Sequence, residues 1–157
     1  MRITEFSGYE AGISGLYIKP LEMIFGDNGN IMKMIRSDSE FFMGFGEAYF
    51  SRIKPGIIKG WHKHMEVTSC YAVPYGFVKL VVYDDRAGSL TYGKFEEIYM
   101  GPENFLLVRV PTGVWNGFKA LSSSVSLIAV CLDKPHHPVE MERLPITADT
   151  IPYDWAA

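Results

Sequence analysis

Hydrophobic and polar positions alternate along this chain in short runs, and few windows hold the three-to-four-residue period of an amphipathic helix. Alternation over a few residues is typical of a strand with one buried face. The pattern therefore predicts strands nearly throughout. The expected strands are Leu16–Ile18, Asn30–Ile35, Gly46–Ile53, Ile57–His64, Cys70–Pro74, Gly76–Asp84, Lys94–Met100, Phe105–Val110, Gly113–Ala120 and Ser126–Asp133.

Segments rich in Gly, Pro, Asp and Asn separate these runs, and each has the residues of a chain reversal. They include Gly26–Asn30, Lys54–Gly56, Pro74–Gly76, Asp84–Ser89, Gly101–Asn104 and Pro111–Gly113. So many strands joined by tight turns suffice to close an all-β sandwich or barrel. After Asp133 the alternation stops, and a tail with several prolines runs to Ile151–Trp155. We expect this tail to lie across the domain surface or a partner subunit.

Composition narrows the class of protein. A length of 157 residues with 48% hydrophobic and 21% charged positions is typical of one folded domain. Fifteen basic against eighteen acidic residues give a net charge of −3, which excludes a general nucleic-acid-binding surface. The longest apolar stretch, Val125–Leu132, is too short for a membrane helix, and Glu5 interrupts any signal-peptide pattern. We therefore expect a cytoplasmic protein without a membrane or nucleic-acid partner.

Two cysteines, Cys70 and Cys131, lie within expected strands and have no Cys-x-x-Cys partner. Isolated cysteines in apolar strands are most often small buried hydrophobic residues. We expect neither a disulfide nor a metal pair from them.

One polar cluster is embedded in an expected strand, at Gly60–His64. Residues two apart in a strand point to the same face, so His62 and His64 are expected to point together. A later strand beginning at Gly113 places Asn116 in a similar apolar setting. Two such strands suggest the mouth of a barrel. The alternative is that both histidines face solvent on an edge strand.

These segments resemble a known family. Lys59–His62, Tyr83–Phe95 and Val110–Phe118 follow one another in the order and spacing of the dTDP-4-dehydrorhamnose 3,5-epimerase family. Phe25–Gly29, Glu47 with Ser51, and the Ile151–Trp155 ending of its short branch fit the same family. The resemblance implies a jelly-roll barrel of the cupin superfamily, a double-stranded β-helix. It predicts a single cupin domain over residues 1–157, with the barrel at about 25–133 and an extended C-terminal tail at 134–157.

The resemblance also implies a reaction. In this family a base removes a proton next to the keto group of a nucleotide-linked 4-keto-6-deoxy sugar, and an acid returns it from the other side, without metal or cofactor. His62 falls on the base, and an imidazole titrates near neutral pH as that role requires. Lys59 falls where the family has an arginine against the nucleotide phosphates. Glu47 falls where the family often has glutamine.

Several family residues are replaced. Ser69 stands in place of a lysine that stabilises the enolate, and Ala129 in place of the tyrosine acid. Asn116 replaces a histidine, Asn28 replaces a phosphate-binding arginine, and the segment with the aspartate that orients the base is absent. Loss of the positive charge that stabilises the enolate would raise the reaction barrier by roughly a few kcal/mol.

Local residues offer replacements. If Ser69 faces inward, so does Tyr71, which we expect to serve as the acid, and Glu66 or Glu47 would orient His62. The expected catalytic residues are therefore His62 and Tyr71. The expected substrate-binding residues are Glu47, Lys59, His64, Ser69 and Asn116.

Three functions follow from this set. The first is a nucleotide-sugar epimerase or a related isomerase for polysaccharide biosynthesis. The second is a cupin that binds a carbohydrate or nucleotide sugar without turnover. The third, a metal-dependent cupin, ranks last because Glu66 is too close to His64 for the usual ligand spacing and Asn116 is a poor ligand. We expect no metal, and an exposed loop at His136–His137.

The N-terminal third has more aromatic and Met side chains than a small barrel can hide. This excess predicts an isologous homodimer in which Leu16–Ile18 or Asn30–Ile35 extends the sheet of the partner.

Overall fold

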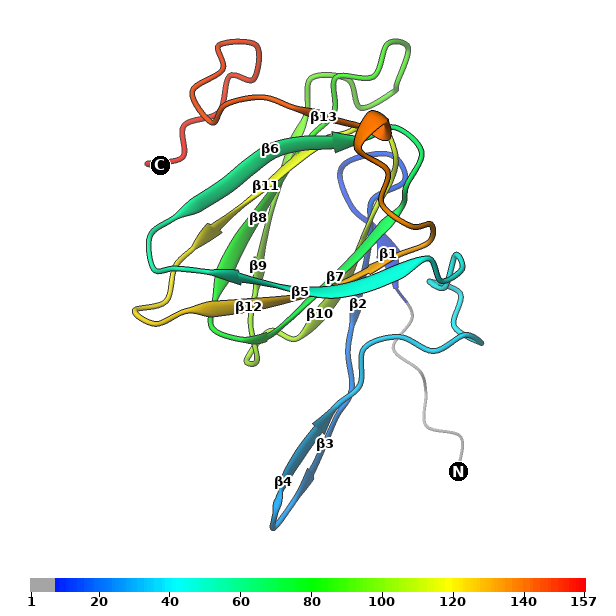
Figure 1. Cartoon of the computed structure of the whole chain (residues 1–157), viewed down its shortest axis with the longest axis vertical. Coiled ribbons are helices and arrows are strands. Elements are labelled where there is room, and N and C mark those ends of the chain that lie inside the picture. The colour runs from blue at the N-terminus through cyan, green and yellow to red at the C-terminus, as the bar shows by residue number, and fades with distance from the viewer. Residues whose placement is uncertain (1–7) are drawn as a thin grey trace.

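Two antiparallel sheets face each other in a computed structural model that describes residues 8–157 (Figure 1). The six-stranded sheet has the order β1 (Tyr9–Glu10), β2 (Tyr17–Pro20), β10 (Leu106–Val110), β7 (Ser69–Tyr75), β12 (Ser126–Leu132) and β5 (Glu47–Ile53). The five-stranded sheet has the order β13 (Met141–Arg143), β6 (Ile58–His64), β11 (Trp115–Ala120), β8 (Val78–Tyr83) and β9 (Phe95–Met100). This arrangement confirms the expected all-β jelly-roll barrel.

Strand β8 shows how the two faces of the five-stranded sheet are used. Its residues Val78, Leu80 and Val82 belong to the core between the sheets, whereas Val81 and Tyr83 belong to a second apolar cluster on the outer face. Every residue of β8 is buried for this reason. Trp155 from the C-terminal tail packs into the outer cluster, so the tail takes the place of a third layer.

The C-terminal tail adds a strand to the five-stranded sheet. It forms the short 3₁₀ helix η1 (Pro138–Glu140) and then β13, which pairs with the edge of β6. Farther on, Trp155 packs against Trp61 with ring centroids 4.9 Å apart. Because β1 and β2 precede residue 25 and β13 follows residue 133, the sheets extend beyond both expected barrel limits. Within residues 8–157, no helix has the length and hydrophobicity needed to cross a membrane.

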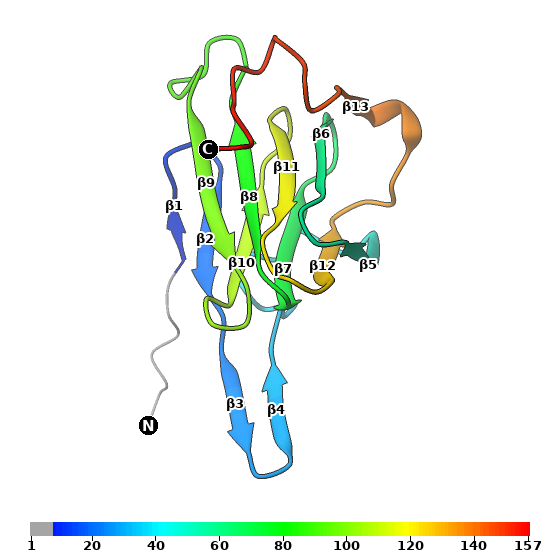
Figure 2. The same cartoon turned by 90° about the vertical axis from the view of Figure 1, so that its left-hand side faces the viewer.

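A hairpin of β3 (Met23–Gly26) and β4 (Gly29–Met32) projects away from the barrel (Figures 1 and 2). It exposes 75% of Phe25 and 60% of Ile31. The expectation that Leu16–Ile18 extends a partner's sheet is wrong, because β2 is hydrogen-bonded to β1 on one side and β10 on the other. Part of Asn30–Ile35 forms β4, which remains available for a partner.

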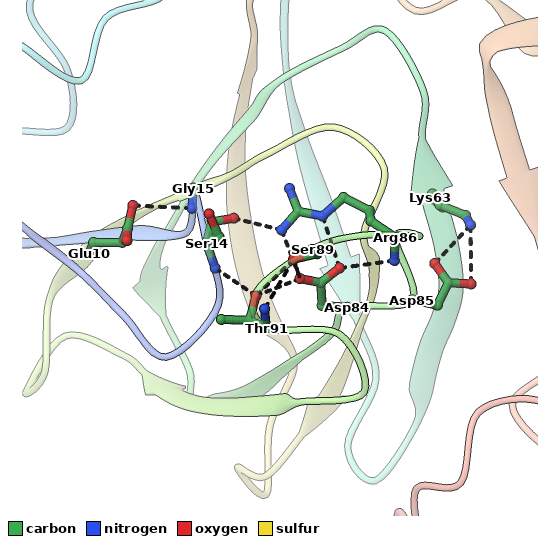
Figure 3. Close-up of polar contacts among 9 residues, drawn as sticks. All are labelled: Glu10, Ser14, Gly15, Lys63, Asp84, Asp85, Arg86, Ser89 and Thr91. Carbon is green, nitrogen blue, oxygen red and sulfur yellow. Dashed lines mark hydrogen bonds and ion pairs between the residues drawn. The ribbon is translucent and has the colours of Figure 1, made fainter.

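The loop after β8 is held by one buried carboxylate (Figure 3). Asp84 is 0% exposed and accepts hydrogen bonds from the side chains of Arg86, Ser89 and Thr91. These bonds outweigh burial and hold the pKa of Asp84 far below its usual range. Arg86 also donates to the carbonyl of Ser14, which joins the loop to the N-terminal segment.

The cysteines lie opposite each other on neighbouring strands β7 and β12. Both thiols are free and buried, as expected, and burial raises the pKa of Cys70 to about 12. At physiological pH Cys70 is therefore a protonated, apolar side chain.

Candidate active site

A pocket of about 580 Å³ opens between β5 and β6, at the side of the barrel where the two sheets part. Alternation supplies the β5 wall and the pair His62 and His64, whereas Lys59 is three residues from His62, beyond an irregularity in the pairing of β6 with β11. Strand β5 contributes Glu47, Tyr49 and Ser51; β6 contributes Lys59, His62 and His64; the tail contributes His136, Met141 and Arg143.

The inward orientation of the two histidines follows from what holds the other face of β6. Lys63 Nζ lies 3.1 Å from Asp85 Oδ1 and 4.6 Å from the centre of the Trp115 ring. Asp85 also accepts a hydrogen bond from the indole N–H of Trp115. The loop drawn in Figure 3 therefore holds Lys63 on the outer face of β6. His62 and His64 then point inward, with ring centroids 5.7 Å apart. The solvent-facing alternative is wrong, since β13 covers this edge.

His62 is a neutral imidazole in this setting. Burial, the neighbouring His64 and the charge of Arg143 lower the pKa of His62 to about 4. A neutral ring has a lone pair free to accept a proton at physiological pH. Asn116 lies opposite His62 on β11 and donates to its carbonyl at 3.5 Å.

His64 instead has a carboxylate partner. Its Nδ1 lies 2.5 Å from Glu140 Oε1, and both side chains are almost fully buried. Glu140 Oε2 accepts the backbone N–H groups of Met65 and Glu66 at 3.0 and 3.2 Å. Burial disfavours ionisation of Glu140, but these hydrogen bonds prevail and lower its pKa. The pair is therefore a histidine with an anionic carboxylate beside it.

His136 completes this corner and raises the question of a metal. The ligand atoms of His64, His136 and Glu140 all lie within 4.8 Å of one another, and histidine and carboxylate groups are good zinc ligands. However, one Glu140 oxygen is already hydrogen-bonded to His64 and the other to two backbone N–H groups. These contacts fit a hydrogen-bonded dyad better than a metal centre.

Known proteins share this architecture. The model of the family described as dTDP-4-dehydrorhamnose 3,5-epimerase matches residues 13–157. The chain belongs to this family. It is similar to the crystal structure of a dTDP sugar isomerase from Desulfovibrio desulfuricans, with 39% identity, a TM-score of 0.90, and coverage of 92% of this chain and 93% of that chain.

Two curated relatives agree with this assignment. The chain is 30% identical over 145 residues to the spore coat polysaccharide biosynthesis protein SpsL of Bacillus subtilis, covering 91% of this chain and 96% of SpsL. It is also 30% identical over 152 residues to the probable low-salt glycan biosynthesis epimerase Agl13 of Haloferax volcanii, covering 92% of this chain and 96% of Agl13. Both names place the relatives in the biosynthesis of polysaccharides or glycans.

The epimerase-family positions fall into two groups in the structure. Glu47, Lys59, His62 and His64 line the pocket. Lys59 Nζ donates to Ser51 Oγ at 3.0 Å and to the carbonyl of Arg52 at 2.6 Å, so it bridges the two walls. These four expected site residues are therefore brought together.

Ser69, Tyr71 and Asn116 lie outside the lining of the pocket. Tyr71 is 3% exposed and packs edge-on against Phe118 in the core, where burial raises its pKa. Ser69 and Asn116 are each 1% exposed. Alternation correctly placed these residues on an inner face, but it gives no measure of depth between two packed sheets.

The expected carboxylate partners of His62 are also placed elsewhere. Glu47 Oε2 accepts the backbone N–H of His136, and Glu66 meets Glu140 through its backbone. The loop at His136–His137 is exposed, as expected, and His136 in addition lines the pocket. Sequence reasoning missed Glu140, His136, Tyr49 and Arg143. For Tyr49 the signal was present, since it lies two residues from both Glu47 and Ser51 on an alternating strand.

Proposed function

We propose that this protein is a nucleotide-sugar epimerase or isomerase that acts on a 4-keto-6-deoxy sugar by metal-free proton abstraction. The observation that carries the proposal is the gathering of a neutral His62, the His64–Glu140 dyad and Lys59 in one pocket of a barrel of the epimerase family. The names of the similar proteins, a dTDP sugar isomerase and a glycan biosynthesis epimerase, support the same substrate class.

His62 is proposed as the base. The carbonyl of the keto sugar acidifies the neighbouring C–H bond, and the unprotonated imidazole accepts that proton. Burial, His64 and Arg143 lower the pKa of His62 to about 4, which makes it a weak base before substrate binds. The enolate formed beside it is an anion and would stabilise the imidazolium as it forms.

Lys59 and Glu47 carry opposite charges in different parts of the pocket. Lys59 lies where β5 and β6 approach each other, and its ammonium suits the pyrophosphate of a nucleotide sugar. Glu47, at the opposite end of the β5 row, repels phosphate and suits sugar hydroxyls. We infer that the nucleotide lies toward Lys59 and that the sugar lies against the histidines.

Solvent deuterium tests the proposal. Incubation with dTDP-4-keto-6-deoxyglucose in D₂O should place label at C3 or C5, which magnetic resonance would detect. Binding of the dTDP sugar with a raised melting temperature but no label would instead support a carbohydrate-binding cupin without turnover. The proposal also includes a cytoplasmic location, in keeping with the biosynthetic roles that the relatives' names give, and a homodimer, which the exposed β3–β4 hairpin supports.

A further inference from the structure

Inversion at a carbon next to a ketone needs more than a base. A cation must stabilise the enolate oxygen, and an acid must return a proton from the face opposite the base. We propose that Arg143 is this cation and Tyr49 is this acid, an inference that rests on the proposed epimerase function. Both line the pocket, and they come from the tail strand β13 and from β5.

Tyr49 lies on the wall across the pocket from the histidines. It belongs to the inward row of β5, whereas its neighbour Phe50 points outward and is 71% exposed. Burial and the charge of Glu47 raise the pKa of Tyr49, with Arg143 acting in the opposite direction. The phenol therefore keeps its proton at physiological pH and has one to donate. Tyr49 is 42% exposed, so it can recover a proton from water.

Arg143 is placed by the register of β13. It lies directly opposite His62, and residues directly opposite in an antiparallel pair share a face. Glu142 accordingly lies on the other face, 4.0 Å from Lys63 Nζ. Within residues 8–157 the Arg143 guanidinium has no hydrogen-bond or carboxylate partner. Its charge lowers the pKa of both His62 and Tyr49, so the guanidinium lies near the proposed base and the proposed acid.

The steps balance without a further reactant. The C–H proton moves to His62, the C–H electron pair forms the C=C bond, and the carbonyl π pair becomes the enolate lone pair beside Arg143. The oxygen pair then re-forms the carbonyl while the carbon takes the phenol proton from Tyr49. Water returns a proton to the Tyr49 phenolate and removes one from the His62 imidazolium.

Two variants separate these roles in the D₂O experiment with dTDP-4-keto-6-deoxyglucose. Tyr49→Phe should lower inverted product by a factor on the order of 10² to 10⁴, while label still enters the substrate with retained configuration from the base side. Arg143→Gln should lower label entry and inversion together, by a factor on the order of 10² to 10³, and Arg143→Lys should restore part of both.

Matched controls are available on the outward row of β5. Phe50→Leu and Arg52→Gln change an aromatic ring and a cation outside the pocket lining, and should keep both signals within about twofold of wild type. Wild-type turnover with undiminished inversion in Tyr49→Phe or Arg143→Gln would overturn this assignment and leave the epimerase function standing. Absence of label and product with wild type would overturn the function itself, and this assignment with it.

Discussion

The imidazole of His64 and the carboxylate of Glu140 meet at 2.5 Å between Nδ1 and Oε1, across 76 positions of sequence. This contact joins β6 to η1, so the tail and the inner wall of the pocket form one unit. Because Nδ1 is occupied, Nε2 is the nitrogen of His64 that is free to meet a substrate. The dyad therefore fixes the orientation of one imidazole that lines the pocket and attaches the tail to β6.

Replacing Glu140 should destabilise the protein in a pH-dependent way. Glu140→Gln removes charge-assisted hydrogen bonds to His64 and two backbone N–H groups, at a cost of about 1–3 kcal/mol. The folded pKa of Glu140 is lowered, so its contribution is present above the ordinary carboxyl pKa and is lost as pH falls through the folded value. Urea unfolding at pH 7 and pH 4 measures this, and the difference between wild type and variant should shrink at pH 4.

The control for this prediction is Glu142→Gln, two residues along the tail. Its carboxylate is largely exposed and lies 4.0 Å from Lys63, so the stability should change by less than about 0.5 kcal/mol. A cost for Glu142→Gln equal to that for Glu140→Gln would show that the effect is general tail charge and not the dyad.

Substitutions of His62 and of His64 should affect different steps, catalysis in the first case and binding in the second. His62→Asn should preserve the fold and most nucleotide-sugar affinity while deuterium incorporation falls by a factor on the order of 10² to 10⁴. His64→Asn should mainly weaken binding, because it disconnects the tail that closes the pocket. Equal incorporation by wild type and His62→Asn would move the base elsewhere, and a large loss in His64→Asn alone would assign it to the dyad.

Most strand positions were predictable because turn residues and alternation mark where each strand begins and ends, although many consecutive strands lie in different sheets. The expected strands match β2 and β4–β12 to within a few residues, including the inward pair His62 and His64. The misses are β1, β3 and β13, which are short or lie outside the main alternating runs. Three residues such as Met141–Arg143 become a strand only because the edge of β6 is free to receive them.

The site was predictable only on the strands that carry it. His62 was found because strand alternation and family spacing coincide there, whereas Lys59 and Glu47 were found from the family resemblance. Glu140 and Arg143 were not, because their role depends on where a Pro-containing tail docks, and that docking is fixed by contacts dozens of residues away. Tyr71 was expected in the site because it faces inward, but it packs in the hydrophobic core. In a packed barrel an inward-facing side chain reaches a site only where a cavity extends to its depth.

Asp84 should stabilise the loop after β8 and take no part in catalysis. Asp84→Asn leaves Arg86 without its buried counter-charge and weakens the bonds to Ser89 and Thr91, at a cost of about 3 kcal/mol. Since the folded pKa of Asp84 is lowered, this stabilisation is full above the ordinary carboxyl pKa and fades only as pH falls below it. Thermal unfolding at pH 7 measures the loss. An unchanged melting temperature would contradict the role of Asp84 in holding the loop.

Purified without a histidine tag, the protein should contain far less than one equivalent of any transition metal. Two imidazoles and one carboxylate approach each other, but Glu140 is committed to hydrogen bonds on both oxygens. Elemental analysis measures the content. Stoichiometric metal that disappears in both His64→Ala and His136→Ala would replace the dyad with a metal centre and favour a metal-dependent cupin.

The β3–β4 hairpin should mediate a homodimer. An isolated two-stranded hairpin is marginally stable in water, yet this one extends from the barrel with Phe25 and Ile31 exposed (Figure 2). A second copy of the chain that pairs with β4 would bury these side chains and satisfy its free edge. Light scattering at micromolar concentration should give about twice the chain mass of 17.7 kDa. Phe25→Ser with Ile31→Ser should shift the protein toward monomer, whereas Leu90→Ser, at a 97% exposed site in the loop after β8, should not. A wild-type mass of one chain would refute the dimer and leave the exposed hairpin without a partner.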